Sequence, residues 1–223
     1  MKRIFILIPL ILAMTVMRGQ NGSCKLALVK YNGGGDWYAN LETSLKNLAL
    51  FCNKNIGTSI DPDQDVIELD NRDLFSYPLL HLTGHGNISL NDREIQNLRS
   101  YLMGGGFLHI DDNYGMDIFI RREMKKVFPE LEFVELPWNH AIYHQSFDFK
   151  YGLPKIHEHD GNEAKGYGLI WNGRLICFYS FESDLGDGWE SPEVHNDTPE
   201  VRTKALKMGA NIVQFAFMGD AVE

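Results

Sequence analysis

The sequence predicts an α/β protein with a mostly parallel central sheet and an antiparallel hairpin near its C-terminus. Short apolar runs alternate with segments whose apolar residues recur at helical spacing, which is typical of parallel strands joined by crossover helices. Three of these runs end at a glycine beside an ionisable residue. Two further runs flank Asn172-Gly173, a pair that suits the two-residue turn of a hairpin.

Local patterns place the elements in chain order. Strands are expected at residues 25–31, 65–69, 79–83, 106–110 and 133–136, and the hairpin strands at 169–171 and 174–179. Helices are expected at residues 41–53, between 91 and 104, and at 116–127 and 200–217. Asn40 is the expected N-cap of the first helix, and Asn91 with Glu94 forms a capping-box pattern before the second. Asp61-Pro62-Asp63 marks a turn before the second strand, and Pro129 ends the third helix.

Two polar stretches interrupt this pattern. Residues 137–168 show no periodicity, and residues 182–199 form a second long loop before the last helix. Loops of this length in a compact domain are usually functional or act as lids. The candidate ligand-binding residues in these loops are His140, His144, Glu182 and Asp184.

Length and composition indicate a single folded domain. The chain has 223 residues, of which 44% are hydrophobic and 23% charged, and no internal repeat divides it. Three cysteines cannot all pair within one chain. Cys52 and Cys177 lie in apolar patterns, as small buried residues do, so a disulfide framework is not indicated.

The N-terminal segment has the pattern of a secretory signal. Lys2-Arg3 precedes an apolar stretch at residues 4–16, which is shorter than the roughly 20 residues that a membrane span needs. We expect residues 1–19 to be removed as a signal peptide, which leaves residues 20–223 as one periplasmic or secreted domain without a membrane span. A buried N-terminal helix is the alternative. Lipidation of Cys24 is not expected, because no leucine-like residue precedes it.

The mature chain is strongly acidic. Removal of residues 1–19 takes away three basic residues and leaves 18 against 30 acidic ones, so the formal net charge changes from −9 to −12. Such a surface repels nucleic acid and anionic lipid, and no run of Lys and Arg opposes this reading. Nucleic acid is therefore not an expected partner.

The ends of three expected strands point to one site. Asp36 follows a glycine run after the first strand, His85 lies between two glycines, and Asp111-Asp112 follows the strand at residues 106–110. In an open parallel sheet, ligands bind beyond the carboxyl ends of the strands. We therefore expect a crevice in which His85, Asp111 and Asp112 hold a hard cation or perform acid–base catalysis. The expected ligand-contacting residues after the first strand are Gly34, Gly35, Asp36 and Trp37.

Each of these motifs has a purely structural alternative. The glycine run at residues 33–35 fits a tight turn, and His85 fits a histidine hydrogen-bonded to a neighbouring loop. Adjacent side chains on an extended segment point to opposite sides. One of Asp111 and Asp112 can therefore face the crevice while the other caps the next helix or binds backbone amides. A helix-start or turn role for both is the alternative.

Other polar residues fit structural roles. His81 and His109 lie within apolar runs and are expected to be core histidines. Residues 157–160 are rich in metal-ligating types, but their spacing matches no helical zinc motif, so a solvated loop is favoured. The sequence contains no nucleophile elbow, and no cysteine lies beside a histidine at an expected strand-to-helix turn.

The motifs together resemble a bacterial family known only as domain of unknown function 4159. The matching stretches are residues 31–37, 83–86, 104–113, 138–144, 152–156 and 182–189. This family is grouped with folds similar to class I glutamine amidotransferases and trehalose-utilisation-like proteins. The resemblance therefore implies a flavodoxin-like three-layer α/β/α sandwich, which agrees with the alternation of strands and helices.

The resemblance does not imply amidotransferase activity, because those enzymes place a catalytic cysteine where this chain has Asp111 and Asp112. Two hypotheses on function follow. In the first, an exported domain binds a small polar ligand, such as a carbohydrate, in the crevice, and a metal or an Asp/His pair assists hydrolysis. In the second, the domain is a non-catalytic interaction module that binds an envelope protein. The sequence leaves open whether the protein is an enzyme and which cofactor it uses.

Overall fold

Strands and helices alternate through most of residues 24–219, which the computed structural model describes. The strands are β1 (Cys24–Lys30), β2 (Ile60–Glu68), β3 (Leu79–His85), β4 (Phe107–Tyr114), β5 (Val134–Glu135), β6 (Lys165–Trp171) and β7 (Arg174–Phe181). The helices are α1 (Ser44–Asn55), α2 (Asp92–Met103), α3 (Asp117–Val127), α4 (Leu185–Trp189), α5 (Pro192–His195) and α6 (Pro199–Met218), with short 3-10 helices η1 (Arg72–Ser76) and η2 (Ala141–Tyr143). The expected signal peptide, residues 1–19, lies outside the described residues.

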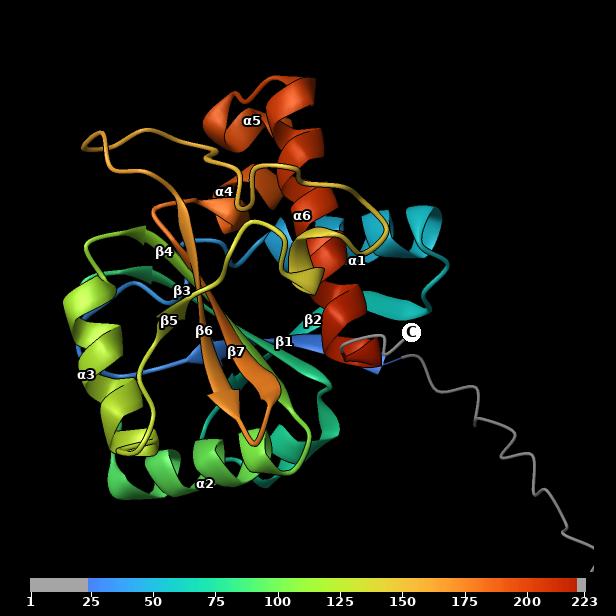
Figure 1. The fold of residues 1–223 in the computed structure, drawn as a ribbon. Helices are drawn as coiled ribbons and strands as arrows, with labels where there is room; N and C mark the ends of the chain where they lie inside the picture. The colour runs from blue at the N-terminus through green and yellow to red at the C-terminus, as the bar shows by residue number, and fades with distance from the viewer. Residues whose placement is uncertain (1–23, 220–223) are drawn as a thin grey trace, which may run out of the picture.

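The strands form one sheet in the order β2-β1-β3-β4-β7-β6-β5 (Figure 1). The five strands from β2 to β7 in this order run parallel, whereas β6 is antiparallel to both of its neighbours. The prediction of an α/β protein with a mostly parallel sheet and a C-terminal hairpin is therefore confirmed.

Helices cover both faces of the sheet and give a flavodoxin-like three-layer sandwich. Helices α2 and α3 lie on one face, and α1 and α6 lie on the other (Figure 1). Consecutive strand residues point to opposite faces. Accordingly, Leu28 of β1 belongs to the apolar cluster under α1 and α6, while Val29 belongs to the cluster under α2 and α3. Burial on both faces explains why the central strands read as continuous apolar runs.

The sequence predicted the local turn and cap geometry correctly at two places. Asn172 and Gly173 have φ values of 50° and 81°, as a two-residue hairpin turn with positive φ at both positions requires. The capping box of Asn91 and Glu94 is present at the start of α2. The prediction of an N-cap at Asn40 is wrong, because its amide donates a hydrogen bond to Asp187 and α1 begins at Ser44 instead.

Two strands are longer than expected. The predicted turn at residues 61–63 is wrong, because β2 already begins at Ile60. Strand β2 tolerates Pro62 because it is an edge strand, and its register with β1 shifts between Lys25 and Ala27. Strand β4 runs on to Tyr114, so the aspartate pair lies within a buried strand instead of in the following loop. No helix among residues 24–219 is long and apolar enough to cross a membrane.

Candidate functional site

The carboxyl ends of β1, β3, β4 and β7 meet at one edge of the sheet, beneath the short helices α4 and α5 (Figure 1). Two loops cover this edge. One contains residues 155–160 and the other runs from β7 through α4 and α5 to α6. The site described below is built from these loops and from the strand ends under them.

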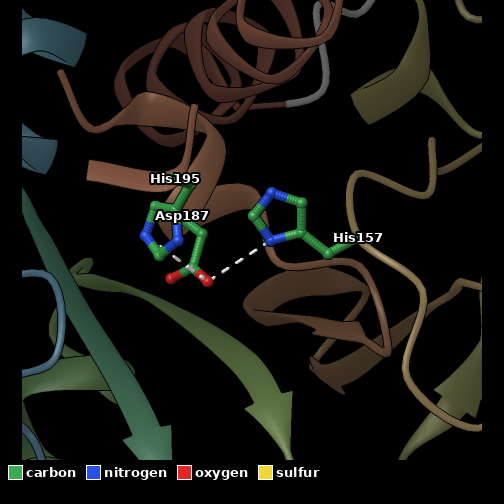
Figure 2. A group of neighbouring side chains, drawn as sticks. All are labelled: His157, Asp187 and His195. Atoms are coloured by element: carbon green, nitrogen blue, oxygen red, sulfur yellow. Dashed lines mark ion pairs between the residues drawn. The ribbon is translucent and has the colours of Figure 1, made fainter. Parts of the chain in front are cut away.

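His157, Asp187 and His195 gather in the two loops (Figure 2). One ligand atom from each lies within 4.8 Å of the other two. The Oδ2 atom of Asp187 is 3.4 Å from His157 Nδ1 and 3.7 Å from His195 Nε2. A tetrahedral ion with bonds of roughly 2.0–2.1 Å holds its ligand atoms about 3.4 Å apart. The donor spacing of this His–Asp cluster therefore fits a small divalent transition metal.

Asp184 adds a second carboxylate beside the His–Asp cluster. Its Oδ2 atom is 3.4 Å from His157 Nδ1 and 2.5 Å from His159 Nε2. The side chain is fully buried, and among the described residues its Oδ1 atom has no hydrogen-bond partner. A buried carboxylate oxygen without a partner is costly, and a bound cation would remove that cost. Asp184 also has a φ of 61°, a strained value for a residue with a side chain.

Acidic neighbours orient His157 and raise its pKa. The Nε2 atom of His157 lies 3.0 Å from both carboxylate oxygens of Asp197, which leaves Nδ1 directed toward Asp187. Metal-binding histidines commonly use their other ring nitrogen in this way. Hydrogen bonds to Asp184 and Asp187, with a smaller contribution from Asp197, raise the pKa of His157 to about 11. A proton therefore occupies this histidine when no metal does.

The cluster also affects Asp187 itself. Burial raises the pKa of Asp187, but hydrogen bonds from His157 and Asn40 more than offset it, so the pKa lies below its usual range. The Nδ2 atom of Asn40 is 2.6 Å from Asp187 Oδ1, and Asn113 Nδ2 is 3.2 Å from the same atom. These amides leave Oδ2 of Asp187 as the oxygen that faces the two histidines.

The structure brings the predicted Asp36 and His85 together. Asp36 Oδ2 is 3.0 Å from His85 Nδ1, and the other oxygen accepts the backbone N–H of His85. Gly33 and Gly34 have φ values of 122° and 95°, so the glycine run makes a tight turn. A Cβ on Gly35 would lie 2.6 Å from the carbonyl oxygen of His85, which shows how closely the two strand-end loops approach. Ligand contacts of Gly34, Gly35, Asp36 and Trp37 stay predictions.

Tyr114 lies between the Asp36–His85 pair and the His–Asp cluster. It pairs with His85 in the ladder of β3 and β4 at the strand ends. Its half-exposed ring has its centroid 5.3 Å from that of His159, which contacts Asp184. The pair and the cluster therefore share one edge of the sheet, with an aromatic ring face between them.

The adjacent aspartates bind backbone amides. Asp111 accepts hydrogen bonds from the amides of Gly186 at 2.6 Å and Leu185 at 3.3 Å, and from the Ser180 hydroxyl. Asp112 accepts the amide of Met116 at 3.0 Å, before α3. Burial raises the pKa of Asp111 to about 8 and that of Asp112 to about 6. Each aspartate thus anchors the start of a helix, and catalytic roles for both stay predictions.

A chain of buried hydrogen bonds connects the core to Asp111. His81 and His109 face each other through their Nδ1 atoms at 3.0 Å, and His109 Nε2 lies 2.9 Å from Ser180 Oγ. Burial lowers the pKa of His81 to about 3 and that of His109 well below its usual range. Because the Ser180 hydroxyl donates its proton to Asp111 or to the Ile110 carbonyl, it accepts from His109 Nε2–H, and His81 Nδ1–H donates to His109 Nδ1. The prediction of core histidines is confirmed.

The remaining loop candidates lie apart from the His–Asp cluster or support it. His144 pairs with Asp148 at 2.6 Å. The ring of His140 is 5.8 Å from that of Phe215, which packs on the first residue of β4, at the opposite edge of the sheet. Glu182 is buried and pairs with Lys155 at 3.4 Å. Of the four loop candidates, Asp184 is the one in contact with the cluster.

The family model of a domain of unknown function, DUF4159, matches residues 25–217. The chain belongs to this family. No curated protein matches it. The DUF4159 match covers the sheet and both long loops, so every residue of the His–Asp cluster lies within the matched region.

The sequence did not predict that the three residues of the His–Asp cluster in this DUF4159 domain form one site. The expectation of a solvated loop holds for residues 158–160, which are exposed, although His159 also contacts Asp184. It is wrong for His157, whose Nδ1 atom contacts the buried carboxylate of Asp184. Asp187 and His195 were visible as polar residues of the second loop, but their partner lies in a different loop. The available signal was the concentration of His and Asp in both loops without periodicity.

Proposed function

We propose that this DUF4159 domain binds a divalent transition metal at His157, Asp187 and His195, and binds and hydrolyses a small polar ligand in the crevice beside it. The observation that supports this proposal most is the spacing of the three donor atoms, all within 4.8 Å of one another. Two imidazoles with a carboxylate favour Zn²⁺ and similar ions over Mg²⁺ and Ca²⁺, which prefer oxygen ligands.

The residues around the metal site suggest how hydrolysis would proceed. A bound Zn²⁺ supplies an acidified water or polarises a carbonyl or phosphoryl oxygen. His85 is held through Nδ1 by Asp36, so its Nε2 atom is free to act as a general acid or base. The Tyr114 ring, 47% exposed, offers a flat apolar face with a polar tip, which suits a ligand ring such as that of a sugar.

Calorimetry and metal analysis test the metal site. The EDTA-treated protein is titrated with Zn²⁺, Mn²⁺, Mg²⁺ and Ca²⁺, and bound metal is counted per chain. We expect one Zn²⁺ per chain, and a loss of at least tenfold in affinity in His195→Ala, whose ring is partly exposed. His144→Ala is the matched control, because His144 also pairs with an aspartate but lies away from the cluster. Equal Zn²⁺ affinity in His195→Ala and the wild type would refute the site.

A separate measurement tests hydrolysis. Nitrophenyl esters, phosphates and glycosides are assayed with the Zn²⁺-loaded protein and with His85→Ala, an exposed position whose loss leaves the cluster intact. We expect turnover of at least one substrate class and its loss in the variant, with Zn²⁺ binding unchanged. Metal binding without turnover of any substrate would support the metal site and contradict the proposed hydrolase activity.

We also propose that the domain acts outside the cytoplasm on a scaffold related to glutamine amidotransferases. The N-terminal apolar stretch at residues 4–16 supports export, and the three-layer sandwich with residues of the site at its strand ends supports the relation. N-terminal sequencing of the protein from an envelope fraction tests export. A chain that begins at Gln20 is expected, and one that retains Met1 would contradict it.

One observation favours a second candidate, a non-catalytic interaction module that binds an envelope protein. Asp111 and Asp112, at the position of an amidotransferase nucleophile, are both occupied with backbone amides. A pull-down from envelope extracts discriminates between the candidates. A stable partner that is retained by His85→Ala and His195→Ala would favour the module over the hydrolase.

A further inference from the structure

A groove that contains none of the His–Asp cluster residues follows the flank of α6. Three adjoining cavities of about 400, 460 and 290 Å³ form it. The first two share Phe149 and Lys204 in their walls, and the last two share Tyr151. The groove therefore extends from the N-terminal half of α6, across residues 147–154, to the start of β6.

Aromatic side chains line the groove with exposed ring faces. Tyr151 is 96% exposed and Trp138 is 62% exposed, and Phe147 and Phe149 lie half-buried beside them. Large apolar side chains that gather at one concave place on a soluble protein indicate a binding surface. Tyr and Trp rings combine an apolar face with a polar tip, which suits the faces and hydroxyl groups of sugar rings.

The α6 end of the groove carries lysines without acidic partners. Among the described residues, no carboxylate lies within ion-pair distance of Lys150, Lys204 or Lys207, whereas Lys25, Lys125, Lys155 and Lys165 are paired. Lys46 and Lys54 of α1 are also unpaired, but they do not line a cavity with other lysines. Lys207 lies over the Phe147 ring, with its Nζ atom 5.5 Å from the centroid. In a chain with a net charge of −9, such free cations are placed to meet an anion.

We propose that the groove binds an anionic polysaccharide, with sugar rings against Trp138 and Tyr151 and carboxylate or sulfate groups beside Lys150, Lys204 and Lys207. The α6 end also contains two carboxylates, Glu200 and Asp148, against three lysines, and that of Asp148 is paired with a histidine. The site is independent of the proposed metal.

The opposite end of the groove favours a saccharide over an acidic peptide. Glu135 and Glu163 line the wall beside Trp138. Glu135 is paired with Lys165 of the same wall at 3.2 Å, and among the described residues Glu163 has no cationic partner. This end therefore offers no free cation to a chain that carries a charge at every position, such as an acidic peptide. Sugar hydroxyls donate hydrogen bonds to carboxylates, so a chain in which charged and neutral sugars alternate satisfies both ends of the groove.

Biolayer interferometry with immobilised hyaluronan oligosaccharides tests the proposal. Chondroitin sulfate separates sulfate from carboxylate recognition, dextran supplies a neutral chain, and poly-glutamate supplies an acidic peptide. We expect saturable binding of hyaluronan or chondroitin sulfate that weakens with added salt, no binding of dextran, and no effect of EDTA. Affinity falls at least tenfold in the triple variant Lys150→Glu, Lys204→Glu, Lys207→Glu, and at least tenfold in Trp138→Ala with Tyr151→Ala.

A matched variant controls for net charge. The triple change Lys46→Glu, Arg72→Glu, Arg93→Glu alters the charge equally at exposed positions that do not line the groove, and we expect it to retain wild-type affinity. The proposal is overturned if neither anionic glycan binds, if this control loses affinity equally, or if poly-glutamate binds as tightly as hyaluronan. Circular dichroism of all variants verifies that they fold.

Discussion

The change Asp111→Asn tests whether Asp111 is a protonated anchor of α4. The wild-type carboxyl is fully buried, and burial raises its pKa to about 8 from an ordinary value of 3.8. The folded protein therefore binds a proton at Asp111 between about pH 4 and pH 8 that the unfolded chain releases. Stability contributed by this group falls as the pH rises through that window, by about 1.4 kcal/mol per pH unit. Between pH 5 and pH 7 the expected loss is about 3 kcal/mol.

Asparagine reproduces the protonated form at every pH. Its oxygen can accept the Gly186 amide. Its NH₂ group can donate to Ser180 Oγ, as a neutral Asp111 would, when the Ser180 hydroxyl donates to the Ile110 carbonyl 3.1 Å away instead of to the carboxylate. Urea unfolding at pH 5, 6 and 7 in EDTA measures the free energy of unfolding of both proteins. The buried histidines and His157 titrate in both, so their effects cancel in the difference. We expect the free energy of unfolding of the variant, relative to that of the wild type, to increase by about 3 kcal/mol from pH 5 to pH 7. A difference that stays constant with pH would refute a protonated Asp111.

Three further predictions follow from the site and its supports. Zn²⁺ must displace the proton of His157, whose pKa is raised to about 11. The Zn²⁺ affinity measured by calorimetry should therefore rise about tenfold per pH unit from pH 6 to pH 8, and an affinity that does not change with pH would exclude His157 as a ligand. Trp189→Ala removes a ring that is 1% exposed and should lower the free energy of unfolding by about 3–5 kcal/mol in urea; a loss below 1 kcal/mol would show that the site collapses around it. Gly84→Ala, at a φ of 131°, places a Cβ 2.5 Å from the Tyr31 hydroxyl and should cost more stability than Gly105→Ala, which meets nothing within 4 Å at a φ of 114°; equal melting temperatures would contradict the close approach.

The layered fold could be predicted from the sequence because the patterns that indicate its strands and turns are local. An apolar run such as residues 79–83 reports a strand covered on both faces, and Asn172-Gly173 reports its own turn geometry. The ends of helices and strands were harder to predict, because tertiary contacts determine where they lie. Asn40 has the side chain of an N-cap, yet its amide binds Asp187, which follows it by 147 residues.

The sequence predicted the part of the site at the strand ends but not the part in the loops. Asp36 and His85 were placed at one edge by the topology, which needs only the strand pattern. His157 meets Asp187 and His195 because two irregular loops fold over that edge, and irregular loops have no periodicity from which a contact can be inferred. The sequence offered backbone amides as partners of an aspartate in the Asp111–Asp112 pair. It could not say which amides Asp111 binds, since they belong to a five-residue helix inside the second loop.

Anomalous diffraction at the zinc absorption edge, from crystals grown with Zn²⁺, tests the central claim most directly. We predict one strong anomalous peak about 2.0–2.2 Å from His157 Nδ1, His195 Nε2 and Asp187 Oδ2, with Asp184 and Glu190 as the neighbouring carboxylates. A map without a peak at this position, in which His157 still bridges Asp184, Asp187 and Asp197 as an ion pair, would contradict it.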